Sequence, residues 1–463
     1  MYERDTIAAI ATPPGQGGVA IIRVSGAQAE TVARQIFVFA HPSDQLVSHH
    51  FYFGRISDPV TGSSLDQGLL VLMRSPRSYT GEDVVELHCH GGSWLSRRIL
   101  AAVLGQGARL ATPGEFTKRA FLNGRLDLSQ AEAVLDLIQA KSDRGLSLAW
   151  EQLSGRLAAA CAGLRERLLG LTAYVEAFID FPDEDIPERS RTELGQELCT
   201  LIADAEALGA TFSQGKVYRE GIRTVIIGKP NVGKSSLLNL LAGSERAIVT
   251  AVPGTTRDVL EETIVIGGIP LVVWDTAGLR RPADEVERIG VERARSGLRE
   301  AELVLAVFDA SQPFADEDEA VCREVADKNV IPVLNKNDLP LVLNPLEPER
   351  RLHAGLLVRL SAKSGIGVEQ LVERIQQVTL GEQSACRQAQ GGEVIVSRER
   401  HSAALAKTVQ NLRHATAGLS EGVPLDLVSV DLRAALDHIG EITGYVSTED
   451  ILDKVFREFC IGK

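Results

Sequence analysis

A glycine-rich segment that follows a short apolar run constrains this chain more than any other feature. The β-prone run Thr224–Ile227 leads into residues 228–235, which read GKPNVGKS, and the helix-prone segment Ser236–Leu241 follows. This is the complete G-x-x-x-x-G-K-[ST] pattern in the strand, turn and helix context that a phosphate-binding loop requires. Backbone N–H groups of the loop would surround the phosphates, and the positive end of the helix dipole would favour their negative charge. We expect Lys234 to meet the β- and γ-phosphates and Ser235 to hold Mg²⁺.

Three more motifs stand in the order that a guanine-nucleotide site requires. They are Asp275-Thr276-Ala277-Gly278 after the apolar run Leu271–Trp274, Asn335-Lys336-Asn337-Asp338 after Val330–Leu334, and Ser361-Ala362-Lys363. A carboxylate at Asp275 can orient a metal-bound water, and Gly278 lets the backbone approach the γ-phosphate. The Asp338 carboxylate can accept two hydrogen bonds from the N1 and N2 edge of guanine, which adenine lacks. Each motif alone could be a polar turn, but together they predict GTP binding.

The predicted nucleotide contacts cover the loop, a switch segment and the base-recognition motifs. They are Asn231, Val232, Gly233, Lys234, Ser235, Ser236, Thr250, Thr255, Thr256, Asp275, Thr276, Ala277, Gly278, Asn335, Lys336, Asp338, Ser361, Ala362 and Lys363. Thr256 lies in the sequence Gly-Thr-Thr-Arg-Asp at 254–258, where its hydroxyl can sense Mg²⁺ and the γ-phosphate. Arg257 can stabilise charge there, although a solvated loop arginine fits equally well.

Leu279 stands directly after the Asp-Thr-Ala-Gly motif, where many regulatory GTPases carry a water-orienting glutamine. An aliphatic side chain cannot orient water, so another group must do so. Glu287, in the acidic segment that follows, is the candidate. From the residues alone, a solvated start of a surface helix is the favoured interpretation of that segment.

The order of predicted elements indicates a multidomain fold. Residues 1–118 alternate β-prone runs with Gly/Pro turns and one helical stretch, which predicts a small α+β domain. Residues 119–218 and 381–463 have helical periodicity, and residues 219–380 alternate strands and helices as in a doubly wound parallel sheet. We predict one helical domain interrupted by an inserted α/β domain, although two separate helical domains would give the same pattern.

Bulk composition excludes several classes of protein. No apolar run approaches the roughly 18 residues of a membrane span, and the N-terminus lacks a signal-peptide core, so we expect a cytoplasmic protein. The net charge of −13 gives no general attraction to nucleic acid. Six scattered cysteines indicate free thiols. His88 and His90 share one strand face while Cys89 faces away, which disfavours a metal site there.

Taken together, the loop with Asn231, the Gly-Thr-Thr-Arg-Asp segment and Asp-Thr-Ala-Gly-Leu resemble the TrmE-Era-Era-like family of GTPases. Further matching segments lie outside the α/β region. They are Ala11–Val19, Gly81–Val84, Pro113–Phe116, Phe181–Glu184 and the terminal Cys460–Lys463. The resemblance spans nearly the whole chain and indicates the branch of the family that modifies tRNA. It implies a Ras-like P-loop GTPase domain inserted in the helical domain.

The resemblance also implies cofactors and site residues. The N-terminal domain would bind a tetrahydrofolate derivative, 5-formyl- or methylene-tetrahydrofolate, and drive homodimerisation. Matching positions for the folate are Arg23, Glu86, Arg125 and Lys463, where the family often has lysine at position 125. K⁺ would be a catalytic cofactor held by Asn231 and by backbone oxygens around Thr250, Val252 and Thr255. Glu287 would position the attacking water. Cys460 would be a working thiol, whereas an idle free cysteine is the alternative.

The implied reaction places a carboxymethylaminomethyl or aminomethyl group on C5 of the wobble uridine of certain tRNAs. The chain would work with an FAD-binding partner, MnmG (GidA), in a heterotetramer or larger complex. A ribosome-assembly or RNA-binding switch GTPase of the Era/Der kind is the alternative. That kind of protein usually carries an RNA-binding domain or a second GTPase domain, and neither is evident in this sequence.

Overall fold

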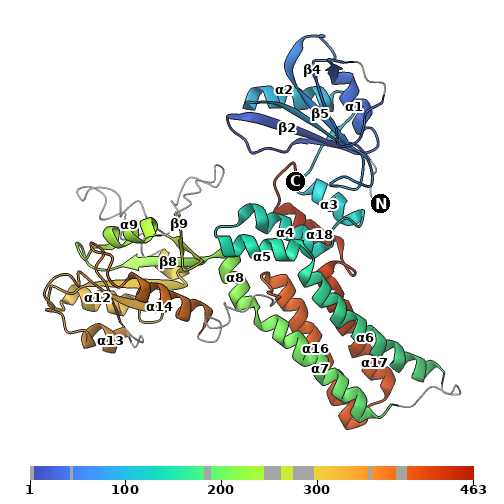
Figure 1. The fold of residues 1–463 in the computed structure, drawn as a ribbon. Helices are drawn as coiled ribbons and strands as arrows, with labels where there is room; N and C mark the ends of the chain where they lie inside the picture. The colour runs from blue at the N-terminus through green and yellow to red at the C-terminus, as the bar shows by residue number, and fades with distance from the viewer. Residues whose placement is uncertain are drawn as a thin grey trace. The chain divides into compact units, whose positions relative to one another are not determined.

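The computed structural model describes residues 5–41, 45–181, 189–244, 262–274, 297–352, 357–381 and 394–463 (Figure 1). The chain forms two compact units. The first combines Met1–Leu135 with Asp437–Lys463, and the second consists of Asp136–Leu436.

The first unit is built on a largely antiparallel sheet of seven strands in the order β3-β4-β5-β6-β2-β1-β7. The strands are β1 (Ile7–Ile10), β2 (Gly17–Ser25), β3 (Phe37–Phe39), β4 (Phe51–Ser57), β5 (Ser64–Met73), β6 (Val84–Gly91) and β7 (Arg109–Leu110). Helices α1 (Ala29–Ile36) and α2 (Ser93–Leu104) pack on one face (Figure 1). Alternation along β2 places Ile22 and Val24 in this core and turns Arg23 to the other face.

Two short helices and the C-terminus complete the first unit. Helix α3 (Glu115–Leu122) lies against α18 (Glu449–Arg457), with Phe456 and Phe459 in a small apolar cluster. The Phe116 backbone N–H donates to the carbonyl of Lys463 at 3.2 Å, so the last residue is held at the start of α3. The chain's C-terminus therefore lies beside the N-terminal sheet.

Helices surround the α/β segment in sequence on both sides. They are α4 (Leu128–Gln139), α5 (Asp143–Leu153), α6 (Arg156–Asp180), α7 (Arg191–Ala210) and α8 (Phe212–Glu220) before it, and α16 (Glu399–Glu421) and α17 (Leu425–Thr443) after it. Ser190 caps α7 by accepting from the Glu193 N–H, and the Glu193 carboxylate accepts from the Ser190 N–H in return. Helix α7 packs along α16, which follows the α/β segment in the sequence.

The α/β segment forms a six-stranded sheet in the order β13-β12-β11-β8-β10-β9, parallel except for the edge strand β9. The strands are β8 (Ile222–Ile227), β9 (Glu262–Ile266), β10 (Ile269–Val273), β11 (Leu303–Asp309), β12 (Val330–Asn335) and β13 (Val358–Arg359). The strand order reverses direction at β8, and such a point is where parallel sheets bind ligands. The architecture confirms the predicted fold class, including the interrupted helical domain.

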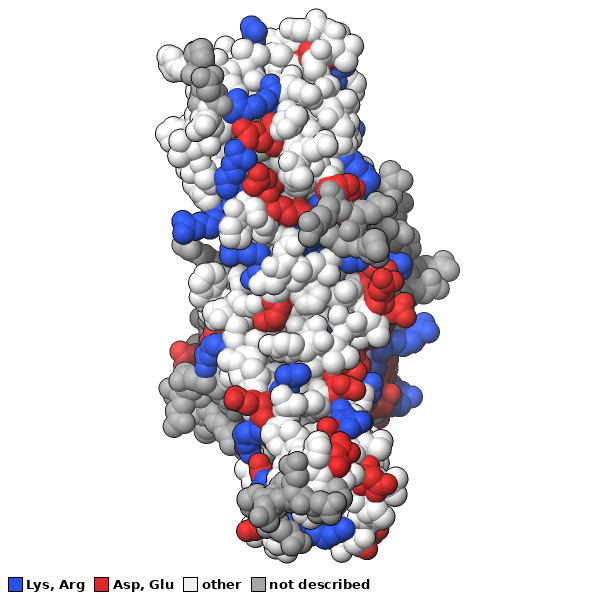
Figure 2. All heavy atoms as spheres, turned by 90° about the vertical axis from the view of Figure 1, so that its right-hand side faces the viewer, with Lys and Arg blue, Asp and Glu red and all other residues white. Residues whose placement is uncertain are grey.

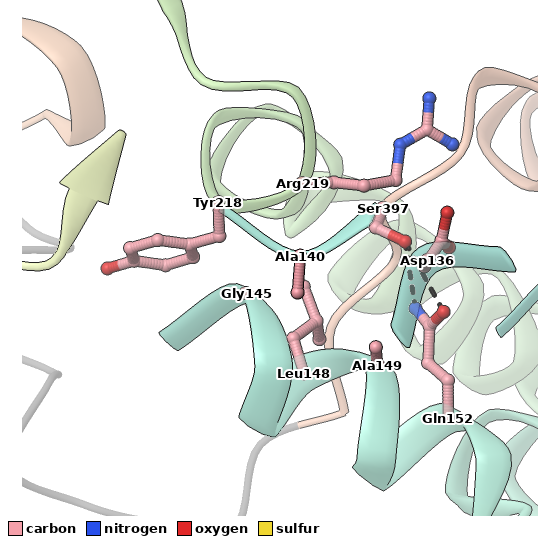
Figure 3. A pocket seen from close by; sticks show the side chains of 9 residues that line it. All are labelled: Asp136, Ala140, Gly145, Leu148, Ala149, Gln152, Tyr218, Arg219 and Ser397. Atoms are coloured by element: carbon pink, nitrogen blue, oxygen red, sulfur yellow. Dashed lines mark hydrogen bonds between the residues drawn. The ribbon is translucent and has the colours of Figure 1, made fainter. Parts of the chain in front are cut away.

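The segment that follows the α/β region, residues 394–398, contacts helices α4 and α5 through polar groups, of which Figure 3 shows Gln152 and Ser397. Gln152 donates to the Ile395 carbonyl and to Ser397 Oγ, each at 3.0 Å. Arg398 donates to both oxygens of buried Asp136, at 2.6 and 3.2 Å. A small pocket, partly open to solvent, lies beside these groups and is lined by Asp136, Gln152 and Ser397 among others. These contacts hold residues 395–398 against α4 and α5.

No helix among the described residues combines the length and the apolar character that crossing a membrane requires.

Candidate functional site

The phosphate loop lies where the sequence predicts it, between β8 and α9 (Lys234–Ser244). Lys234 Nζ donates to two carbonyls of its own loop, at 2.7 Å to Gly228 and 2.9 Å to Lys229. Burial lowers the pKa of the Lys234 ammonium group. A partly desolvated cation at a helix N-terminus attracts an anion strongly, so this loop is built to receive phosphate.

Two glycines of the loop are required by space and by backbone conformation. A Cβ on Gly228 would lie 2.4 Å from the Val307 carbonyl of β11, and a Cβ on Gly233 would lie 2.3 Å from Asn335 Nδ2. Gly233 also has φ of 96°, which side chains rarely tolerate. The loop is therefore packed tightly against β11 and β12.

Asn335 connects three of the predicted motifs. This side chain is 2% exposed. Its Nδ2 donates to the Val232 carbonyl of the phosphate loop at 2.7 Å, and its Oδ1 accepts from the Ala362 backbone N–H at 2.9 Å. Hydrogen bonds in a buried setting fix relative position strongly. The side-chain amide of Asn335 thus fixes the positions of the phosphate loop and of the Ser-Ala-Lys segment relative to β12.

The base-recognition residues gather at the end of β12. Ser361 Oγ donates to Asp338 Oδ1 at 2.7 Å, and this hydrogen bond holds the pKa of the Asp338 carboxyl below its usual value. Lys336 has φ of 63° and donates to Asp309 Oδ2 at 2.6 Å. The Asp338 carboxylate is solvent-exposed, as it must be to accept from a base.

The remaining predicted nucleotide contacts differ in their exposure, and several lie outside the described residues. Asn231 is exposed with φ of 62°, Ser235 is half-buried, and Ser236 and Lys363 are exposed. A further set falls outside the described residues: Thr250, Val252, Thr255, Thr256, Asp275, Thr276, Ala277, Gly278 and Glu287.

A second polar cluster lies in the first unit, on the sheet face that α1 and α2 leave open. Arg23 and Glu86 are cross-strand partners on β2 and β6, and Arg23 Nε donates to Glu86 Oε1 at 2.8 Å. Arg23 Nη1 also donates to the Gly462 carbonyl at 3.4 Å. The guanidinium lies 5.5 Å from the Tyr79 ring centroid and 5.7 Å from that of Phe116. Two aromatic rings and a paired carboxylate thus surround the Arg23 guanidinium.

Lys463 belongs to this second cluster. Burial and the nearby Arg23 charge lower the pKa of its ammonium group, while Glu86 opposes that shift. Burial raises the pKa of Glu86, but His88 and Arg23 together bring it below its usual value. Cys460 and Arg125 are exposed. The carbonyl of Cys460 accepts from the Gly114 N–H at 3.4 Å, which places this residue at the start of α3.

Several residues of both sites were not predicted from the sequence. Tyr79, Phe116 and His88 surround the Arg23–Glu86 pair, and His88 Nε2 lies 3.4 Å from Glu86 Oε2. Asp309 ends an apolar run, as Asp275 and Asn335 do, so its position in the sequence was a usable signal. The aromatic residues gave no such signal, because only the folded sheet brings them to Arg23.

Comparisons with known proteins agree over the whole chain. A family profile described as the MnmE helical domain matches residues 128–460, and one described as the GTP-binding protein TrmE N-terminus matches residues 6–125. A tRNA modification GTPase MnmE from Desulforamulus reducens is 45% identical over 99% of both chains. Another MnmE, from Moorella thermoacetica, is 46% identical over 99% of both. A solved structure of Era from Aquifex aeolicus matches 41% of this chain and 65% of its own, with 26% identity and a TM-score of 0.25.

Proposed function

The chain belongs to the MnmE family of tRNA modification GTPases, and on this premise we propose how its two polar clusters are used. The protein is a GTPase that acts in tRNA modification. We propose that, with the FAD-binding partner MnmG, it adds a carboxymethylaminomethyl or aminomethyl group at C5 of wobble uridine. GTP hydrolysis would drive rearrangement of the protein, and the one-carbon chemistry would use the first unit.

The observation that carries the GTPase assignment is the connection of three motifs through Asn335. Lys234 binds the β- and γ-phosphates, Ser235 offers a hydroxyl to the metal, and Asp338 accepts from guanine. A bound Mg²⁺ would neutralise phosphate charge that develops during hydrolysis. Loop backbone N–H groups orient the phosphates, and the Ser361–Lys363 segment, which the Ala362 N–H ties to Asn335, would face the base.

A potassium ion is part of the proposal because the resemblance to the TrmE-Era-Era-like GTPases implies one. The Asn231 amide is the one predicted K⁺ ligand side chain within the described residues, and it stands on an exposed turn of the phosphate loop. Bound K⁺ would supply positive charge against the phosphates where other GTPases use an arginine. Glu287 would position the water. Replacing K⁺ by Na⁺ in a hydrolysis assay tests this step, and equal rates would eliminate it.

A folate derivative fits the second cluster on chemical grounds. Arg23 lies between aromatic rings, which suits a flat pterin, and Lys463 offers a partly desolvated ammonium group to a carboxylate tail. Bound folate would supply the one-carbon unit. Glu86 orients Arg23, and the Gly462 carbonyl holds the C-terminal residues against that pair. Cys460, exposed in this segment, is the proposed thiol.

Homodimerisation is proposed through the open face of the first sheet. Val38, Phe51, Phe53 and Leu69 lie on neighbouring strands of that face and are 37–57% exposed. Phe51 also contacts the His88 ring edge to face at 5.3 Å, so the apolar area is continuous with the Arg23 cluster. A large unpartnered apolar area is typical of a protein interface. The folate site would then lie beside the dimer contact.

Binding of tRNA must depend on local contacts or on the partner protein. On the face drawn in Figure 2, acidic and basic side chains are interspersed among uncharged ones. Full-length similarity to tRNA modification GTPases favours this function over the switch GTPase of the Era/Der kind. We place the activity in the cytoplasm.

The direct test is mass analysis of tRNA nucleosides from cells that lack the protein. We expect loss of the C5 modification at wobble uridines and its return when the wild-type gene is restored. A Lys234→Ala gene should not restore it, because the phosphate loop would then lack its cation. Unchanged wobble uridines in the deletion strain would rule out the modification function.

A further inference from the structure

A buried ion pair joins the phosphate loop to α12 (Asp316–Glu324), a helix to which no motif assigns a role. Lys229, the second residue of the loop, donates from Nζ to Asp318 Oδ2 at 2.8 Å. The Lys229 side chain is 12% exposed and that of Asp318 is 1% exposed. Charges this well buried are retained only when each has its partner, so the two side chains hold each other in place.

Asp318 is fixed independently at its own end. Its Oδ2 also accepts from the Ala315 backbone N–H at 3.0 Å, at the N-terminus of α12. Its Oδ1 is buried and has no hydrogen-bond partner among the described residues. Helix N-termini stabilise carboxylates. The carboxylate is therefore a rigid anchor that the helix presents to the loop.

The other end of Lys229 touches the phosphate-binding cation directly. An ammonium group has three N–H donors, and Lys234 uses two of them on the carbonyls of Gly228 and Lys229. The positions of those two carbonyls therefore fix the direction in which the third N–H of Lys234 points. The Gly228 carbonyl is fixed because that residue packs against Val307, whereas the Lys229 carbonyl belongs to the residue that Asp318 holds.

We propose that Asp318 and Lys229 are positioning residues for GTP hydrolysis, which hold the Lys229 carbonyl where it aims Lys234 Nζ at the phosphates. This inference concerns the GTPase step alone, so it is independent of the modification chemistry proposed above.

The test uses the full-length protein with a fluorescent GDP analogue and with GTP. Nucleotide affinity and single-turnover hydrolysis at saturating GTP are measured for Asp318→Asn and Lys229→Met, below the melting onset of each variant. We expect each to weaken nucleotide binding about tenfold, as loss of one charge-assisted hydrogen bond would. Hydrolysis at saturating GTP should also slow, because Lys234 would be misaimed. Lys229→Arg should stay near wild type.

The double variant Lys229→Met/Asp318→Asn makes the test specific. If the two residues act through one contact, the nucleotide affinity of the double variant is no lower than that of the single variant with the lower affinity. Glu300→Gln is the matched control, because it breaks the exposed Arg223–Glu300 pair of the same domain and should change neither measurement.

Three results would overturn the proposal. Tighter nucleotide binding by Asp318→Asn would mean that Lys229 is a phosphate ligand which Asp318 restrains. A lower melting temperature with unchanged affinity and hydrolysis in both single variants would mean a purely structural pair. Additive losses in the double variant would mean two separate roles. Wild-type hydrolysis in the same assay separates any of these from a failure of the GTPase assignment itself.

Discussion

At the scale of single residues, we expect Asp338 to determine which base the site accepts. The geometry presents its carboxylate at the end of β12, held by the Ser361 hydroxyl. Asp338→Asn replaces an acceptor pair by a donor and an acceptor, which no longer matches the N1 and N2 donors of guanine. We expect GTP affinity to fall by at least about tenfold and xanthosine triphosphate to become the better ligand. Competition binding with both nucleotides measures the change, and retained tight GTP binding would contradict the assignment.

Glu115 makes the stability of the first unit depend on pH, with a loss of stability in acid. Burial raises the pKa of Glu115, but Arg109, the Thr112 N–H and Arg119 bring it down to about 2. A folded-state pKa below the unfolded value stabilises the fold above about pH 5, and this contribution is lost as pH falls towards 2. The full contribution is about 3 kcal/mol.

Glu115→Gln should therefore lower the stability of the first unit at pH 7 and reduce its further loss between pH 5 and 3. Hydrogen exchange of the β1 amides at several pH values measures this. Asp450→Asn is the control, since Asp450 is exposed at the start of α18 in the same unit and should change the acid response little. An acid response identical to wild type in Glu115→Gln would contradict the prediction.

At the scale of elements, the phosphate loop depends on Gly233 more than on any other glycine of α9 or its approach. Gly233→Ala would combine an unfavourable φ of 96° with a Cβ 2.3 Å from Asn335 Nδ2. Displacing Asn335 would release the Val232 carbonyl and the Ala362 N–H together. We expect nucleotide affinity to fall more than about tenfold, from strain of 1–3 kcal/mol or more. Gly243→Ala within α9 meets nothing within 4 Å and should bind nucleotide normally.

How far the sequence predicts these elements depends on the range of the interaction. The loop and the motifs at strand ends were predictable, because glycine spacing and apolar runs are local signals. Asn335 was predicted as a base-site residue, but its hydrogen bond to Val232 joins residues 103 positions apart. The Arg23–Glu86 pair depends on strand register, and Lys229–Asp318 on where α12 packs. Such contacts follow from the assembled sheet, so only the fold identifies them.

At the scale of the whole molecule, residues 394–398 connect the α/β segment to the helices of the second unit. Segment 394–398 is held by Gln152 and Asp136, and Arg398 contributes the buried ion pair. Arg398→Met leaves the Asp136 carboxylate buried without this partner and should cost about 3–5 kcal/mol of stability. Arg413→Met is the control, because it breaks an exposed pair with Glu206. Chemical unfolding of both variants compares the two, and equal midpoints would contradict the role of the joint.

The proposed pairing of two copies is a property of the whole molecule. The open sheet face places Phe53 beside Leu69 and Arg55, so a charge there would be buried by any partner that covers the apolar area. Phe53→Asp should weaken self-association by about tenfold or more, since the interface would lose the Phe53 ring and would have to desolvate a carboxylate, which Arg55 beside it offsets only in part. Sedimentation at graded concentrations measures this, with Val60→Asp, on an exposed turn between β4 and β5, as the control.

Hydrolysis in K⁺ should then depend on concentration over the wild-type dimerisation range and lose that dependence in Phe53→Asp. A wild-type rate per molecule that is constant down to the monomer range would separate hydrolysis from pairing.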